Sequence, residues 1–191
     1  MEIINRIKNV LISPKTEWVT IEEENKPHLK VFTGYIVPLA LIPAVAAFIG
    51  YGLIGYSVLG IQIGGLGIGI KYAISHYITM LGGVYLTAFV ISLLAENFGS
   101  EKDFNKAFSL VAYAYTPVLI GGVFQIYYSL SILVTLTSIY SLYLLFIGLQ
   151  PMMKTPAEKR VSYFIVSLVV MVAAYFILSL VLSSIFIRSL I

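Results

Sequence analysis

Long apolar runs separated by short charged clusters are the feature that most constrains this chain. Charged side chains fall in residues 2–30, 96–106 and 154–160, and outside these stretches only Lys71 and Arg188 carry charge. The runs between the clusters reach about 20 residues or more, the length that one α-helix needs to cross the hydrocarbon core of a bilayer. Helices of soluble proteins pair an apolar stripe with a polar face, and these runs lack the polar face. The sequence therefore predicts an all-α polytopic membrane protein.

The spacing of the runs predicts a bundle of five transmembrane helices that follows an N-terminal arm at residues 1–30. The spans are expected at about 31–51, 72–95, 107–127, 130–149 and 161–187, within one transmembrane domain over residues 31–191. The division between the third and fourth spans is the least marked, because no charged residue lies between Lys106 and Lys154. Two spans are expected there because the stretch is about twice as long as one crossing requires.

Lysine and arginine are divided very unevenly between the two ends of such a bundle. Of the 12 basic residues, all except Lys71 and Arg188 would lie at the end that carries the arm, and so would all 9 acidic residues. Basic residues are enriched on the cytoplasmic side of membrane proteins. We therefore expect a cytoplasmic N-terminus and a C-terminus on the outside.

The arm begins with an amphipathic pattern. One face of the expected helix is apolar and the other is polar, and the apolar face carries Ile3, Ile4, Ile7, Val10 and Leu11. This pattern is typical of an interfacial helix that lies in the membrane surface. Trp18, the only tryptophan, fits an anchor in the headgroup region. Two interpretations follow: a collar that packs on the bundle, or an arm that binds a partner or senses lipid.

The expected spans carry no aspartate, glutamate, lysine or arginine near their middle, which argues against an ion pump or a proton-coupled carrier. The third span contains AYAYTPVLIGG, in which Pro117 removes one backbone hydrogen bond. Tyr113, Tyr115 and Thr116 are placed to help satisfy the carbonyl that is freed. With Gln125, these residues form a candidate functional motif. The motif is interpreted either as a packing feature or as part of a substrate path.

The segment after the fourth span is a second candidate. Pro151 is expected to end the fourth helix, and Thr155 is expected to cap the fifth. A possible cytoplasmic docking surface is formed by five cations, Lys102, Lys106, Lys154, Lys159 and Arg160. The alternative is that these charges only fix the topology of the loop.

Three further patterns bear on structure and function. The glycine-rich segment 51–72 is expected to be a flexible outer loop or a short re-entrant segment. The chain has no cysteine, and His28 and His76 are expected on opposite sides of the membrane, so no metal site is predicted. No known catalytic or cofactor-binding motif is present, and no catalytic residue, cofactor or nucleic-acid partner is predicted.

Four stretches together carry a family resemblance. They are LISPKTEW, TGYIVPLALIPAVAAFIG, AYAYTPVLIGGVF and YSLYLLFIGLQPMMKTPAEKR. Their order and spacing resemble the Yip family, the Ypt/Rab-interacting integral membrane proteins, in its short bacterial and archaeal branch. The resemblance covers nearly the whole chain. It implies five spans, a cytoplasmic N-terminus and a non-enzymatic role.

Eukaryotic members of the Yip family bind small Rab GTPases and one another, and they act in vesicle formation and organelle membrane shape. This chain has an arm of only about 30 residues and lacks the acidic DLYGP signature of those members. The resemblance therefore does not carry Rab binding over to this chain. The short arm indicates a prokaryotic cytoplasmic membrane.

The function that these patterns favour is a membrane scaffold or adaptor, which assembles with itself or with other membrane proteins. The first alternative is a transporter or channel for a small solute, with a path near Pro38 and Pro43 of the first span and Pro117 of the third. A lipid-handling enzyme is a lower alternative. Beyond the lipid bilayer, no partner is identified by the sequence.

Overall fold

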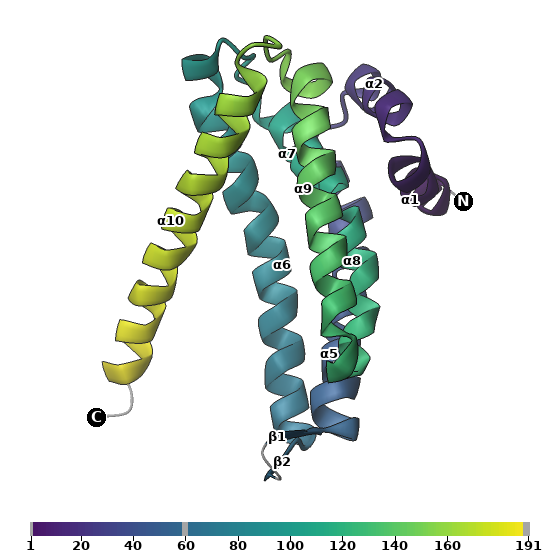
Figure 1. The fold of residues 1–191 in the computed structure, drawn as a ribbon, viewed down its shortest axis with the longest axis vertical. Helices are drawn as coiled ribbons and strands as arrows, with labels where there is room; N and C mark the ends of the chain where they lie inside the picture. The colour runs from purple at the N-terminus through teal and green to yellow at the C-terminus, as the bar shows by residue number, and fades with distance from the viewer. Residues whose placement is uncertain (1, 59–60, 189–191) are drawn as a thin grey trace.

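The computed structural model describes residues 2–58 and 61–188 of the chain. Figure 1 shows a bundle of long helices with a short hairpin at one end and two short helices against the other end. Five helical stretches of the described chain are long and apolar enough to cross a membrane: His28–Ile54, Leu66–Phe98, Phe104–Ile126, Ser131–Met153 and Arg160–Ile177. The predicted all-α membrane bundle with five spans is confirmed.

The arm consists of two short helices, α1 (Glu2–Ile12) and α2 (Pro14–Glu24), and Pro14 stands at the start of the second. The arm and the loops at 99–103 and 154–159 lie at the same end of the bundle, which we call the charged end (Figure 1). The opposite end, with the hairpin, is called the hairpin end.

The first span is built from short helical pieces. They are α3 (His28–Val31), π-helical η1 (Phe32–Ile36), α4 (Val37–Leu39), α5 (Leu41–Ala47) and π-helical η2 (Phe48–Ile54). Pro38 and Pro43 fall inside this span. Proline removes a donor from the helical ladder, and this accounts for the irregular helix before and around Pro38 and Pro43.

The glycine-rich segment forms a hairpin and the first turn of a helix. Strands β1 (Tyr56–Val58) and β2 (Ile61–Ile63) pair antiparallel, and α6 (Leu66–Leu94) follows and continues into η3 (Ala95–Phe98). Residues 59 and 60 lie outside the described residues. The second span thus begins six residues earlier than the expected Tyr72, because Gly52 and Gly69 let the two segments approach closely. A β-carbon added to Gly52 would lie 3.0 Å from the α-carbon of Gly69.

The third and fourth spans are separate helices, as expected. The third contains α7 (Phe104–Ala114), α8 (Thr116–Gly121) and η4 (Gly122–Ile126), and the fourth is α9 (Ser131–Met153), which follows the short η5 (Tyr128–Leu130). The third span is the most buried of the five. Phe108, Leu110, Val111 and Ala112 are all fully buried, so the core of the bundle is centred on α7.

The prediction that Pro151 ends the fourth helix is wrong. The helix continues to Met153, and Lys154 then turns the chain with a left-handed conformation at φ 50°. Carbonyl groups at the end of the helix find partners elsewhere: the Thr155 hydroxyl donates to Leu149 O at 3.0 Å, and Glu101 N donates to Met153 O at 2.8 Å. Thr155 therefore closes the fourth helix, whereas the fifth, α10 (Arg160–Arg188), begins five residues later.

Helix α10 leans away from α6 towards its C-terminal end (Figure 1). Its first turn is fixed to the bundle by Tyr163, which is fully buried. The Tyr163 hydroxyl donates to Ile91 O at 2.5 Å, and its ring stacks on Phe98 with 4.9 Å between centroids. Between residues 164 and 177 about half of the side chains are exposed, and the exposed ones are apolar, as expected for a helix that faces lipid.

Candidate functional site

The break in the third span at Pro117 is closed by local hydrogen bonds. Pro117 has no backbone N–H, so the carbonyl of Tyr113 four residues earlier loses its usual partner. The Thr116 hydroxyl donates to Tyr113 O at 2.6 Å and also forms a 2.7 Å hydrogen bond with the Tyr35 hydroxyl of the first span. The candidate motif therefore joins the third span to the first.

The other two residues of the candidate motif lie elsewhere. Tyr115 turns towards α6, where its hydroxyl is 3.3 Å from Thr87 Oγ1. Gln125 lies at the hairpin end and lines a cavity of about 290 Å³ with His76, Tyr127 and other uncharged residues. The buried carboxamide oxygen of Gln125 has no hydrogen-bond partner. The sequence predicted one motif that includes Gln125. In the structure Gln125 lies apart from Tyr113, Thr116 and Pro117.

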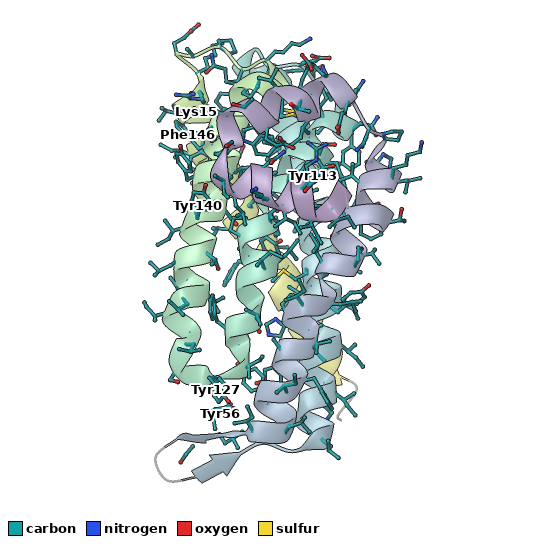
Figure 2. All side chains as sticks on the ribbon, turned by 90° about the vertical axis from the view of Figure 1, so that its right-hand side faces the viewer. Lys15, Tyr56, Tyr113, Tyr127, Tyr140 and Phe146 are labelled. Atoms are coloured by element: carbon teal, nitrogen blue, oxygen red, sulfur yellow. The ribbon has the colours of Figure 1, made fainter. Side chains whose placement is uncertain are left out.

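The arm packs on the charged end of the bundle. Figure 2 views the molecule from the side that carries the arm, and α1 and α2 lie across the bundle near Tyr113. Helix α2 packs against α9, and α1 packs against α2 and α8. The Tyr140 hydroxyl donates to Leu11 O at 2.7 Å. The collar interpretation describes this arrangement.

Trp18 is the largest fully buried side chain of the arm. It is only 1% exposed and packs at Gly148 of α9, where an added β-carbon would lie 2.8 Å from Trp18 Cε2. The expected role of Trp18 as an anchor in the headgroup region is therefore wrong. Its indole is buried in protein because Gly148 leaves room for it.

One buried lysine joins the arm to the bundle. Lys106 Nζ lies 3.1 Å from Glu22 of the arm and 3.1 Å from Glu101 of the loop before α7, and its side chain is 9% exposed. A nearby hydrogen bond joins the start of the first span to α7: the backbone N–H of His28 donates to Asn105 Oδ1 at 3.0 Å. Lys106, expected to be part of a docking surface, is therefore covered by the arm.

Between the arm and the first span lies a cavity of about 560 Å³, which we call the arm cavity. Its wall combines charged, amide, hydroxyl and apolar groups. They are contributed by Ile3, Asn5, Arg6 and Asn9 of α1; Glu17, Thr20 and Glu24 of α2; Lys26 of the turn after α2; Lys30, Val31, Gly34 and Tyr35 at the start of the first span; and Tyr113 of α7. The arm cavity thus contains Tyr113 of the candidate motif.

Arg6 holds the two arm helices together at one side of the arm cavity. Its guanidinium donates to Glu17 and, at 2.5 Å, to both carboxylate oxygens of Glu24, and it lies 5.4 Å from the centre of the Tyr113 ring. Burial would raise the pKa of Glu24, but hydrogen bonds from Arg6 and Lys26 outweigh it and hold the pKa below its usual value. Burial alone would lower the pKa of Arg6, and the hydrogen bond to Glu24 raises it instead.

The loops at 99–103 and 154–159 are tied together and form a second polar surface, which we call the paired-loop surface. Besides the Glu101–Met153 bond, the Ser100 hydroxyl donates to Thr155 Oγ1 at 2.9 Å. Lys154 is 62% exposed in its side chain and pairs with Glu101 at 3.2 Å. Hydrogen bonds from Lys106 and Lys154 hold the pKa of Glu101 below its usual value.

The remaining cations expected at this surface differ in their surroundings. Lys102 is 3.1 Å from Glu96, and Lys159 is exposed with no recorded ion pair among the described residues. Arg160 is held by Gln150 at 3.1 Å and lies 4.5 Å from the centre of the Phe146 ring. Lys102, Lys154 and Lys159 therefore form the accessible part of the paired-loop surface.

Most of the arm cavity was not predictable from the sequence. Arg6, Glu17, Glu24, Lys30 and Tyr35 were not expected to share a site. One signal was available: Glu17 and Glu24 are seven residues apart, which places both on one face of a helix. Lys30 and Tyr35 of the first span gave no such signal, because only the fold brings them close to the arm.

Comparison with known proteins supports the family resemblance. The Yip1 domain family model matches residues 8–186. The chain is also 26% identical over 155 residues to "Inner membrane protein YohC" of Escherichia coli strain K12, which covers 78% of this chain and 80% of that protein. The protein of the same name from E. coli O6:H1 strain CFT073 matches to the same extent.

No solved structure matches this chain closely enough to extend the comparison. The E. coli relatives are inner membrane proteins by name, in agreement with the five apolar spans found here. The family match runs from α1 into α10 and thus includes both the arm and the bundle. The chain belongs to the Yip1 domain family of membrane proteins.

Proposed function

We propose that this protein is a non-enzymatic membrane scaffold that assembles with other membrane proteins through its charged end. The observation that carries the proposal is the packing of the third span. Its central residues are fully buried, and Thr116 and Tyr115 use their hydroxyls in hydrogen bonds within the bundle. A closely packed middle of the span, in which the hydroxyls of Tyr115 and Thr116 are paired inside the bundle, suits a structural role better than a solute path.

The paired-loop surface is the part of the charged end that we assign to docking. Hydrogen bonds at Glu101 and Thr155 tie its two loops, so a partner would meet a surface that is already ordered. Lys102, Lys154 and Lys159 give it accessible positive charge, which favours a partner with an acidic loop.

We place the charged end in the cytoplasm. The end with the arm holds ten of the 12 basic residues, and the positive-inside rule assigns such an end to the cytoplasmic side. The E. coli relatives, named as inner membrane proteins, support a cytoplasmic membrane as the location.

Purification in native lipid particles tests the scaffold proposal. Wild-type protein is compared with a variant that carries Lys102→Gln, Lys154→Gln and Lys159→Gln, and proteins that copurify are identified and quantified by mass spectrometry. Arg160 is left unchanged because it contacts Gln150 and Phe146. The matched control is Lys8→Gln with Lys15→Gln, two exposed lysines of the arm. A membrane protein that copurifies stoichiometrically, and is lost only in the triple variant, is the expected result. Absence of any stoichiometric protein in the wild type contradicts the proposal.

A small-solute transporter is the second candidate, and the cavity at the hairpin end favours it. Among the described residues, the wall of that cavity contains no aspartate, glutamate, lysine or arginine. Its surface is mostly apolar and includes the unpartnered Gln125 oxygen, which suits a small, weakly polar solute. The same purification separates the two candidates, because a small molecule retained without a protein partner would favour transport.

A further inference from the structure

The arm cavity offers more hydrogen-bond donors than its own acceptors use. Its charged lining consists of three cations and two carboxylates, and both carboxylates are held by Arg6. Lys26 shares Glu24 at 3.1 Å, whereas Lys30 has no recorded ion pair among the described residues. A group that enters the arm cavity therefore meets a net positive charge.

The two tyrosines of the arm cavity differ in the state of their hydroxyls. The Tyr35 hydroxyl is engaged with Thr116. Tyr113 is buried as a residue and its ring lies under Arg6. Its hydroxyl makes no hydrogen bond within the described part of the chain, and Tyr113 lines the cavity. The hydroxyl is therefore available to donate to a group that enters the cavity, whose lining also includes Asn5 and Asn9.

Exposed apolar side chains lie beside the charged lining of the arm cavity. Ile3 lines the cavity and is partly exposed, while Ile4 on α1 and Leu29 on α3 are exposed by more than half. At Gly34 an added β-carbon would meet nothing within 4 Å, so the wall of the first span is open there. A ligand that is anionic at one end and apolar at the other fits this combination better than a free anion does.

We propose that the arm cavity binds the phosphodiester headgroup of an anionic phospholipid. Lys30 and Lys26 face the phosphate, Tyr113 donates to one of its oxygens, and the glycerol and first carbons of the acyl chains lie along Ile3 and the open surface at Gly34. The bound lipid also contacts α1, α2 and the first span together, so it stabilises the docked arm. This inference is independent of the scaffold proposal, which concerns the paired-loop surface.

The test uses delipidated full-length protein in detergent and native mass spectrometry of lipid binding. Phosphatidylglycerol and phosphatidylcholine with identical acyl chains are titrated separately. Wild-type protein is expected to bind one phosphatidylglycerol molecule more tightly than phosphatidylcholine. Lys30→Gln should weaken that binding about fivefold, the effect of removing one lysine charge near an anionic lipid. Equal binding of the two lipids to the wild type overturns the proposal.

Two further variants distinguish lipid binding in the arm cavity from attraction of lipid by the surface charge of the arm. Tyr113→Phe keeps the ring under Arg6 and removes only the hydroxyl, and it should also weaken phosphatidylglycerol binding. Lys15→Gln is the matched control, since Lys15 is exposed on α2 and does not line the arm cavity (Figure 2). If Lys15→Gln weakens binding as much as Lys30→Gln, the lipid is attracted by the surface charge of the arm and the proposal fails.

A third titration identifies the source of the phosphate. Inorganic phosphate and glycerol 3-phosphate are added at millimolar concentration in competition with phosphatidylglycerol. The lipid should remain bound, because its acyl chains contribute contacts that the soluble anions lack. Complete displacement would assign the cavity to a soluble phosphate compound instead. Lys30→Arg, which keeps the charge, should bind phosphatidylglycerol like the wild type, and thermal unfolding checks that each variant is folded.

Discussion

The indole ring of Trp18 lies directly against Gly148, which is 130 positions away in the sequence and belongs to the fourth span. An added β-carbon at Gly148 would lie 2.8 Å from Trp18 Cε2 and 3.0 Å from Cζ2. Real β-carbons do not approach a rigid ring so closely, and this ring is held inside the bundle. The docking of the arm therefore depends on the absence of a side chain at position 148.

We predict that Gly148→Ala weakens docking of the arm. Overpacking of a close contact typically costs about 1–3 kcal/mol. Because Trp18 is the only tryptophan, its fluorescence emission should shift to longer wavelength as the ring becomes exposed. Gly82→Ala on α6 is the control, since an added β-carbon there would meet nothing within 4 Å. An unchanged emission spectrum in Gly148→Ala would show that α9 and α2 adjust without undocking.

Thr116→Val should destabilise the protein because it removes the donor to the Tyr113 carbonyl. A buried carbonyl without a partner costs about 1–3 kcal/mol. The loss should be smaller in a chain that also carries Pro117→Ala, since alanine restores the backbone N–H that can donate to Tyr113 O. A double-mutant cycle from thermal or denaturant unfolding measures this coupling, expected at about 1 kcal/mol. Equal costs with proline and with alanine at 117 would contradict the explanation.

The span pattern and the Pro117 motif were predictable because each depends on neighbours in the sequence. Apolar length predicts that a span exists, and Thr116 and Tyr113 lie within one turn of Pro117. Pairings between distant segments were not predictable in this way. The fourth helix continues past Pro151 because Thr155 and Glu101 satisfy carbonyls at its end, and Glu101 is contributed by another loop.

The arm illustrates the same limit for the candidate site. An amphipathic pattern predicts that α1 lies on an apolar surface, but lipid and protein are equivalent partners for such a face. Contacts made by the fold decide in favour of the bundle, among them those of Trp18 with Gly148 and of the buried Lys106 with Glu22. Arg6 lies on the polar face of α1, so the pattern predicts that it faces water. In the structure it lies at the arm cavity between two carboxylates.

Acidification should loosen α1 from α2. The pKa of Glu24 is held below its usual value of 4.5 when it contacts Arg6 and Lys26. A carboxylate whose pKa is lowered by folding contributes stability above its unfolded pKa, and that stability is lost as the pH falls through the lowered value. The contact is therefore fully present at pH 7 and weakens below about pH 4.5.

Hydrogen exchange of the α1 amides, followed by mass spectrometry and corrected for the intrinsic effect of pH, measures this loosening. Protection of α1 should fall on acidification in the wild type. Glu24→Gln should show reduced protection already at pH 7 and a smaller change with pH. Glu23→Gln is the control, because Glu23 is an exposed neighbour that forms no ion pair with the residues that the structure describes. If Glu24→Gln is as protected and as sensitive to pH as the wild type, the Arg6–Glu24 contact does not hold the two helices.

Topology is testable directly because the chain contains no cysteine. Ser57 on β1 and Ala157 in the paired-loop surface are both exposed and lie at opposite ends of the bundle, so a single cysteine at either should react without disturbing the fold. Thr155 is unsuitable, since its hydroxyl contacts both Leu149 and Ser100. In intact spheroplasts, a membrane-impermeant maleimide should label Ser57→Cys and leave Ala157→Cys unlabelled until the membrane is opened. The reverse pattern would place the arm, the paired-loop surface and the arm cavity outside the cell, against the distribution of the basic residues.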